Sequence, residues 1–258
     1  MVTLDNLTVS YRRHPALHHI SGSFAPGSLT AVVGPNGSGK STLLKTIIGL
    51  LPVAGGTITV SEPQSRIAYL PQLADVDRSF PINVYDCVLL GCWPHRGAWG
   101  RVNASQRSAI EGALASVGLQ GFDQRPISSL SSGQLQRVLF ARLLMQDADL
   151  ILLDEPFNAM DGKTTAAVLT TIARWHQQGR TVVVVLHDEG QVRGHFPQAL
   201  LLARELVAWG QTDHVMTVTN LSRARTMAEA WDDDSGLCEI DSLADRRTAP
   251  QTPQMANT

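Results

Sequence analysis

The sequence has no long apolar run and no strong charge of either sign. No apolar stretch reaches the ~18 residues that a membrane-spanning helix needs, and the opening residues show no basic segment followed by an apolar core. We therefore expect a soluble chain whose part in any membrane process depends on partners. The formal net charge is only -2, so nucleic acid is not expected as a partner.

Cysteine is also scarce. Cys87, Cys92 and Cys238 are odd in number and show no C-x-x-C spacing, so the sequence indicates neither a disulfide framework nor a zinc knuckle. The histidines between residues 14 and 19 have no cysteine or carboxylate pair beside them at ligand spacing. We expect a solvated patch there rather than a metal site.

The composition that remains is ordinary for a globular protein. Hydrophobic residues make up 43% and charged residues 17% of the 258 residues, which suits one large domain or one domain with a subdomain. The apolar runs at 150–153 and 181–186 are typical of buried parallel strands, and 163–178 between them has apolar residues at helical spacing. This strand–helix–strand crossover predicts an α/β fold with a mainly parallel sheet.

Other segments complete the expected organisation. Short strands are predicted within 4–24, at 57–60 and at 66–70, and we assign them to an antiparallel β part. Helices are predicted at 84–90, 105–117 and 133–146, which would form a helical subdomain over about 83–146. After Gly210 the apolar pattern thins to one amphipathic helix at 220–231, and we expect the last dozen or so residues to be disordered.

A glycine-rich motif follows the apolar run at 29–33 and precedes a predicted helix at 41–48. Its residues are Gly34, Pro35, Asn36, Gly37, Ser38, Gly39, Lys40 and Ser41, followed by Thr42. In such a loop the backbone N–H groups converge on phosphate oxygens at the positive end of the helix, and Lys40 adds a cation for the β- and γ-phosphates. Ser41 is placed to bind Mg²⁺, so the motif predicts a P-loop for ATP and Mg²⁺.

Two carboxylates end the predicted strand at 150–153. Ligands of open α/β sheets bind at the carboxyl ends of the strands, so Asp154 and Glu155 are expected to face the phosphates. Asp154 suits Mg²⁺ coordination through water, and Glu155 suits a general base that polarises the attacking water. Together with the P-loop, the pair predicts ATP hydrolysis.

The run Leu130-Ser-Ser-Gly-Gln134, followed by Leu-Gln-Arg137, resembles the signature motif of ABC-type ATPases and lies 20 residues before Asp154. The resemblance covers about residues 1–215. It implies a P-loop NTPase core, that is, a mixed sheet flanked by helices, with an antiparallel β part and an inserted helical subdomain. Residues 216–258 would form a C-terminal helix and a tail.

The resemblance also assigns roles to residues outside the three strong motifs. Gln72 matches the glutamine loop that contacts the nucleotide and Mg²⁺, and His187 matches the switch histidine at the γ-phosphate. Tyr11 matches the aromatic residue that stacks on adenine, and Asp161 matches the loop that crosses the dimer. In this family two copies pack head to tail, so a second copy would complete each site. The residues that would close over the ATP of the other copy are Ser131, Gly133 and Gln134.

Ser132 departs from the family pattern because it replaces the first of two signature glycines. A positive φ there would cost a serine on the order of 1 kcal/mol. At a helix start with negative φ, a serine can instead cap the helix. We favour the second possibility and expect normal ATP binding.

The segments 79–86, 157–161 and 205–210 resemble the ATPases of bacterial zinc and manganese importers. This likeness implies import of a divalent metal, zinc first, with an integral-membrane permease and an extracytoplasmic metal-binding protein. The chain would lie in the cytoplasm on the inner face of the membrane, with Phe80, Pro81 and Val84 in the groove for a coupling helix of the permease. An ABC exporter and a non-transport ABC ATPase are the alternatives. The DNA-repair type carries long coiled-coil insertions, whereas only 114 positions separate Lys40 from Asp154.

Overall fold

The computed structural model describes residues 1–11, 14–93 and 102–233. Its larger sheet has six strands in the order β5-β6-β7-β3-β8-β9. The strands are β3 (Leu29–Val33), β5 (Ile67–Leu70), β6 (Leu150–Asp154), β7 (Thr181–Val185), β8 (Gln198–Ala203) and β9 (Glu205–Gln211). Neighbouring strands are parallel except β9, which runs antiparallel to β8. The predicted α/β fold with a mainly parallel sheet is confirmed.

The central strands are buried on both faces. Every residue of β3, β6 and β7 is buried, which explains why each strand is mostly apolar rather than alternating between apolar and polar residues. Alternate residues of β6 enter two cores, with Leu152 on one face of the sheet and Leu153 on the other. The register brings the end of β6 beside the end of β7, with Asp154 opposite Val185.

A smaller antiparallel sheet of three strands, in the order β2-β1-β4, covers one face of the larger sheet. Its strands are β1 (Val2–Tyr11), β2 (His14–Phe24) and β4 (Gly55–Val60). The expected antiparallel part is therefore present, but the strand predicted at 66–70 was assigned to the wrong sheet. It is β5, which pairs parallel to β6, because its apolar residues pack on the parallel core.

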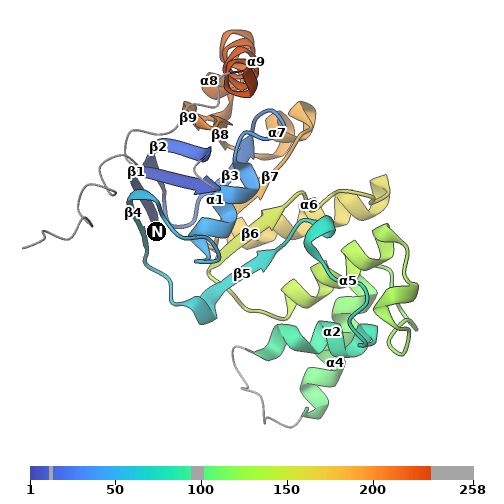
Figure 1. Cartoon of the computed structure of the whole chain (residues 1–258). Helices are drawn as coiled ribbons and strands as arrows, with labels where there is room; N and C mark the ends of the chain where they lie inside the picture. Colours follow the sequence, from blue (N-terminus) through green and yellow to red (C-terminus); the bar gives the residue numbers. More distant parts are fainter. Residues whose placement is uncertain (12–13, 94–101, 234–258) are drawn as a thin grey trace, which may run out of the picture.

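Helices flank the larger sheet. Helix α1 (Lys40–Ile47) lies on the side of the small sheet, and α6 (Gly162–Gln177) packs on the other face (Figure 1). The chain continues after β7 with α7 (Glu189–His195), and after β9 with α8 (Thr212–Val215) and α9 (Val218–Asp233). Helix α9 confirms the helix predicted at 220–231 and extends it by two residues at each end. The tail expected to be disordered lies outside the described residues.

A helical lobe is inserted between β5 and β6 and lies at the opposite end of the molecule from α9 (Figure 1). It contains α2 (Val84–Leu89), α4 (Ala104–Ser116) and α5 (Ser132–Leu144), with single turns η3 (Leu90–Cys92) and η4 (Ile127–Ser129). Two further turns, η1 (Gln64–Arg66) and η2 (Leu73–Asp75), flank β5. Val84 is fully buried in this lobe, so the expectation that it lines a docking groove is wrong. Its apolar side chain belongs to the core.

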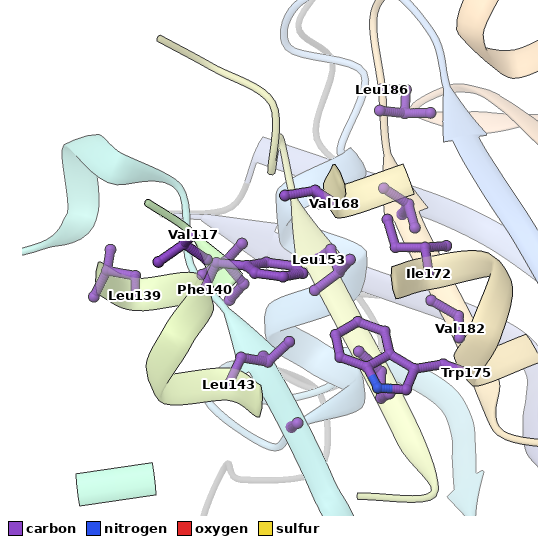
Figure 2. Close-up of a cluster of buried hydrophobic side chains, with 14 of the residues drawn as sticks. Val117, Leu139, Phe140, Leu143, Leu153, Val168, Ile172, Trp175, Val182 and Leu186 are labelled. Carbon is purple, nitrogen blue, oxygen red and sulfur yellow. The ribbon is translucent and has the colours of Figure 1, made fainter. Parts of the chain in front are cut away.

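Helix α5 joins the lobe to the sheet. Figure 2 shows Phe140 of α5 among Leu153 of β6 and Trp175 of α6, and the ring centroids of Phe140 and Trp175 are 5.7 Å apart. Burial of such aromatic side chains stabilises the junction by roughly 1.5–3 kcal/mol each. The N-terminal end of α5 is thereby held beside the loop that follows β6.

Within the described ranges, no helix combines the length and the apolar character needed to cross a membrane.

Candidate nucleotide-binding and catalytic site

The loop between β3 and α1 has a backbone that only glycine fits at two points. Gly34 has φ of 148°, and a Cβ there would lie 2.0 Å from the Leu202 carbonyl oxygen. Gly39 has φ of 92°, and its Cβ would lie 2.3 Å from the Ala16 carbonyl oxygen. These close approaches and positive φ angles exclude a side chain at both positions.

Lys40 folds back over this loop. Its ammonium donates to the Gly34 carbonyl at 2.9 Å and to the Pro35 carbonyl at 2.7 Å. Burial lowers the pKa of Lys40 to about 8, although the nearby carboxylates of Glu155 and Asp154 oppose this shift. A charge that is costly to bury gains most from a bound anion, so the loop is prepared for phosphate.

Asp154 lies at the end of β6 and is completely buried. Its Oδ1 accepts a hydrogen bond from the Ser41 hydroxyl at 3.1 Å, whereas its buried Oδ2 has no hydrogen-bond partner among the described residues. Burial raises the pKa of Asp154 to about 6, against the opposing effect of Ser41. A buried carboxylate oxygen without a partner, next to a hydroxyl, is the donor set that Mg²⁺ accepts.

Glu155 is the best-connected polar residue of the site. Its Oε1 lies 2.6 Å from His187 Nε2, and its Oε2 accepts a hydrogen bond from the Asn158 amide. Gln72 also hydrogen-bonds to this carboxylate. Burial raises the pKa of Glu155, but these hydrogen bonds and the His187 ring outweigh it, so the pKa is lowered overall. The carboxylate is therefore ionised and oriented as a general base must be.

The backbone of Glu155 has φ of 50°, a left-handed conformation that is unfavourable for a residue with a side chain. It persists because the loop is fixed from behind. Gln136 of α5, which is fully buried, donates to the Pro156 carbonyl at 3.2 Å. Helix α5, which begins within the signature motif, thus supports the loop that carries Glu155, the candidate base.

These residues surround one hollow of about 870 Å³. Its lining comprises Tyr11, Ala16, Asn36, Gly37, Ser38, Gly39, Lys40, Ser41, Thr42, Gln72, Glu155, Asn158 and His187. Gly34 and Asp154 are not part of this lining, although Lys40 contacts the first and Ser41 the second. Tyr11 is 46% exposed at the rim, where its ring is available for stacking. The structure therefore brings most of the P-loop together with Tyr11, Gln72, Glu155 and His187 around one hollow.

Asn158 belongs to the site but was not predicted from the sequence. Its amide lies three residues after Glu155 in the turn that follows β6, and the asparagine in Phe157-Asn-Ala-Met-Asp161 was the available signal. It contacts the carboxylate because the turn brings residues three apart together.

The signature residues are not among the described residues that line the hollow. Ser131 caps α5, and its hydroxyl accepts from the Gln134 N–H at 3.3 Å while the Gln134 side chain accepts from the Ser131 N–H at 3.0 Å. Asp161 caps α6 by accepting from the Thr164 N–H at 2.8 Å, and this bond lowers its pKa. These side chains have local roles in the single chain, and their predicted contacts with nucleotide stay a prediction.

Gly133 also has a local role. A Cβ on Gly133 would lie 2.3 Å from the Ala159 carbonyl oxygen, a distance at which the backbone must move. The second signature glycine is therefore required by packing within one chain, apart from any contact with nucleotide.

Ser132 only partly follows the expectation. It is the first residue of α5 and does not have a positive φ, so a serine side chain causes no backbone strain there. The capping residue is Ser131, however, and not Ser132. The Ser132 hydroxyl accepts a hydrogen bond from Arg78 at 2.9 Å, since its position beyond the cap turns it toward the loop after Gln72.

Comparisons with known proteins agree with this geometry. The sequence pattern described as ABC transporter matches residues 17–158. The manganese transport system ATP-binding protein MntB of Bacillus subtilis is 41% identical over 86% of this chain and 91% of its own length. The zinc transport system ATP-binding protein TroB of Treponema pallidum is 40% identical over 86% of each.

Comparison of the fold with solved structures also indicates an ATP-binding cassette. The ATP-binding cassette MJ0796, solved as a dimer in a post-hydrolysis state with ADP and Pi, superimposes with a TM-score of 0.74 at 26% identity. The match covers 82% of this chain and 99% of that one. This chain belongs to the ABC transporter family as a nucleotide-binding ATPase, and the glycine-rich loop and the paired carboxylates described above agree with this.

Proposed function

We propose that the chain is the ATP-hydrolysing subunit of a membrane transporter that imports a divalent metal ion, with zinc as the first candidate and manganese as the second. The observation that supports this most is the similarity, at about 40% identity over most of the chain, to ATP-binding proteins named for zinc and manganese transport. The described residues offer no group of three or more His, Cys, Asp or Glu side chains suited to a metal.

ATP would occupy the hollow beside α1. The adenine would stack on Tyr11, and the phosphates would lie over the backbone N–H groups of residues 36–42 at the positive end of α1. Lys40 would then exchange its two carbonyl partners for the β- and γ-phosphates. Because its pKa is depressed without an anion, the incoming phosphates would restore the full charge of its ammonium.

Ser41, Asp154 and Gln72 would hold the Mg²⁺ of Mg-ATP, with Asp154 acting through water. When bound, Mg²⁺ neutralises charge on the β- and γ-phosphates. Glu155 would take the proton of the attacking water, and His187, which now contacts Glu155 Oε1, would contact the γ-phosphate. Catalysis then rests on positioning and electrostatics rather than on covalent chemistry.

A second copy would complete each site. Ser131, Gly133 and Gln134 of one chain would close over the ATP of the other, and Asp161 would cross between the two. The γ-phosphate would hold the pair together, and hydrolysis would let it open, as in other switches that depend on this group. The Ser131 hydroxyl can donate to a phosphate while it accepts from the Gln134 N–H.

We assign residues 1–215 to the nucleotide-binding domain, 83–146 within it to the helical subdomain, and 216–258 to a C-terminal appendage. The permease would dock its coupling helix beside Phe80, which is 56% exposed, and beside the exposed Pro81. The chain would then lie in the cytoplasm against the inner face of the membrane. An extracytoplasmic binding protein would deliver the metal.

The test is transport by the complex reconstituted with its permease and binding protein in liposomes. ATP-dependent uptake of radioactive zinc, or of manganese, should be faster than uptake of iron and should vanish with Glu155→Gln. Transport of none of these metals, or ATP-driven movement in the export direction, would overturn the proposal.

A further inference from the structure

The segment from Gln72 to Ser79, called here the connecting segment, is tied to the nucleotide site at its start. Gln72 hydrogen-bonds to Glu155. Three residues later, in η2, the Asp75 carboxylate forms an ion pair of 2.7 Å with Lys45 of α1. Both ties join the segment to elements that hold the nucleotide of the same chain.

The end of the same segment is tied to the signature motif. Asp77 fixes a turn by accepting from the Ser79 N–H at 2.8 Å and from the Ser79 hydroxyl at 2.7 Å. The turn presents Arg78, whose guanidinium donates to the Ser132 hydroxyl at 2.9 Å. Ser132 stands between Ser131 and Gly133, the residues assigned above to the nucleotide of the second copy.

The acceptor in this contact is the side chain that departs from the family pattern. A glycine at position 132 would offer Arg78 no hydroxyl, so the link between the connecting segment and α5 depends on the serine. The other side of the same helix end packs on the loop after β6, with Gly133 against Ala159. The start of α5 therefore lies between two loops, and each loop carries a residue of the site in its own chain, Gln72 or Glu155.

We propose that Arg78 is a positioning residue which, through Ser132, fixes the signature turn to the connecting segment, so that the state of one nucleotide site sets the placement of the signature residues over the other. This inference rests on the ATP-sandwich dimer proposed above. It gives a physical reason for serine at position 132. Arg78 itself need not contact nucleotide.

The test is a double-mutant cycle on the ATPase rate of the full chain, with kcat and KM for ATP determined separately. Arg78→Ala and Ser132→Val should each lower kcat about three- to tenfold, the range expected for loss of one ordinary, solvent-exposed hydrogen bond, and should leave KM within about twofold. The double variant should show no further loss, because both changes remove the same contact. Ser132→Thr, which keeps the hydroxyl at the size of valine, should retain more of the kcat than Ser132→Val.

Controls separate this proposal from simple loss of fold and from failure of the proposed function. Arg174→Ala removes an exposed arginine of α6 and should leave kcat unchanged, and thermal unfolding identifies any variant that loses rate by unfolding. Folded Arg78→Ala with the parental kcat, losses that multiply in the double variant, or an effect on KM alone would overturn the positioning role. These rates are measured without metal cargo, so a wrong cargo would not alter their outcome.

Discussion

Replacement of Gly133 by alanine tests whether the signature glycine is needed inside a single chain. The added Cβ would lie 2.3 Å from the Ala159 carbonyl oxygen, far inside the ordinary carbon–oxygen contact distance. The neighbour is backbone, so relief requires movement of the loop at 155–161 or of the start of α5. Overpacking of this kind costs about 1–3 kcal/mol.

The change in stability should be visible without nucleotide. For a chain of this size, 1 kcal/mol corresponds to a shift of about 2–4 °C in Tm, so the 1–3 kcal/mol cost of Gly133→Ala should lower the Tm of the nucleotide-free chain by about 2–12 °C. Differential scanning calorimetry measures this shift in Tm directly. The loop that moves carries Glu155 and Asn158, so the intrinsic ATPase rate should also fall.

Gly162→Ala is the matched control. Gly162 is the first residue of α6 and has no positive φ, and a Cβ there would come within 4 Å of no described atom beyond its chain neighbours and its own helix. Alanine at this position should leave Tm unchanged or raise it, since it reduces the entropy of the unfolded chain. Equal Tm values for the two variants would refute the packing role and leave Gly133 with a role only toward nucleotide.

Three further substitutions test the site. Asp154→Asn should lower Mg²⁺-dependent ATPase activity by at least ~100-fold. Because the folded-state pKa of Asp154 is raised to about 6, the stability that its protonated form contributes is full below pH ~3.8 and is lost as pH rises through 6. Nucleotide-free Asp154→Asn should therefore gain stability relative to the parent between pH 5 and pH 7.5. A difference in Tm between the two proteins that stays constant with pH in calorimetry would contradict a raised pKa for Asp154. Asn158→Ala should lower kcat severalfold with little change in KM, because it removes a hydrogen bond that orients Glu155; an unchanged kcat in steady-state kinetics would argue against this role. Tyr11→Ala should weaken ATP binding about tenfold by titration while Tyr11→Phe retains it, since stacking needs only the ring, and equal affinities would exclude stacking.

The sequence predicted the positions of the P-loop and of the paired carboxylates in the fold better than the arrangement of the strands. The P-loop at 34–41 and the pair Asp154–Glu155 are local motifs whose strand and helix context can be read from neighbouring residues, and both lie where expected. The strand at 66–70 was placed in the wrong sheet because a short apolar run does not encode its pairing partner. Strand β8 at 198–203 was not predicted, although its residues are apolar.

Contacts between distant loops were beyond sequence analysis. The hydrogen bond from Arg78 to Ser132 joins residues 54 positions apart, and no spacing rule connects them. The same holds for Gly133 and Ala159, which meet only because α5 packs beside the turn after β6. Motifs predict which side chains carry the chemistry, whereas the packing of distant loops decides which other side chains contact them.

The central claim is that the chain hydrolyses ATP in a site completed by a second copy, with Glu155 as the base. The most direct measurement is the molar mass of the Glu155→Gln variant in the presence of Mg-ATP, determined by size-exclusion chromatography with light scattering. We expect a dimer that retains two ATP molecules and turns over at least ~100-fold more slowly than the parent, while the nucleotide-free variant remains a monomer. A monomer with bound ATP, or a variant that hydrolyses ATP at the parental rate, would contradict it.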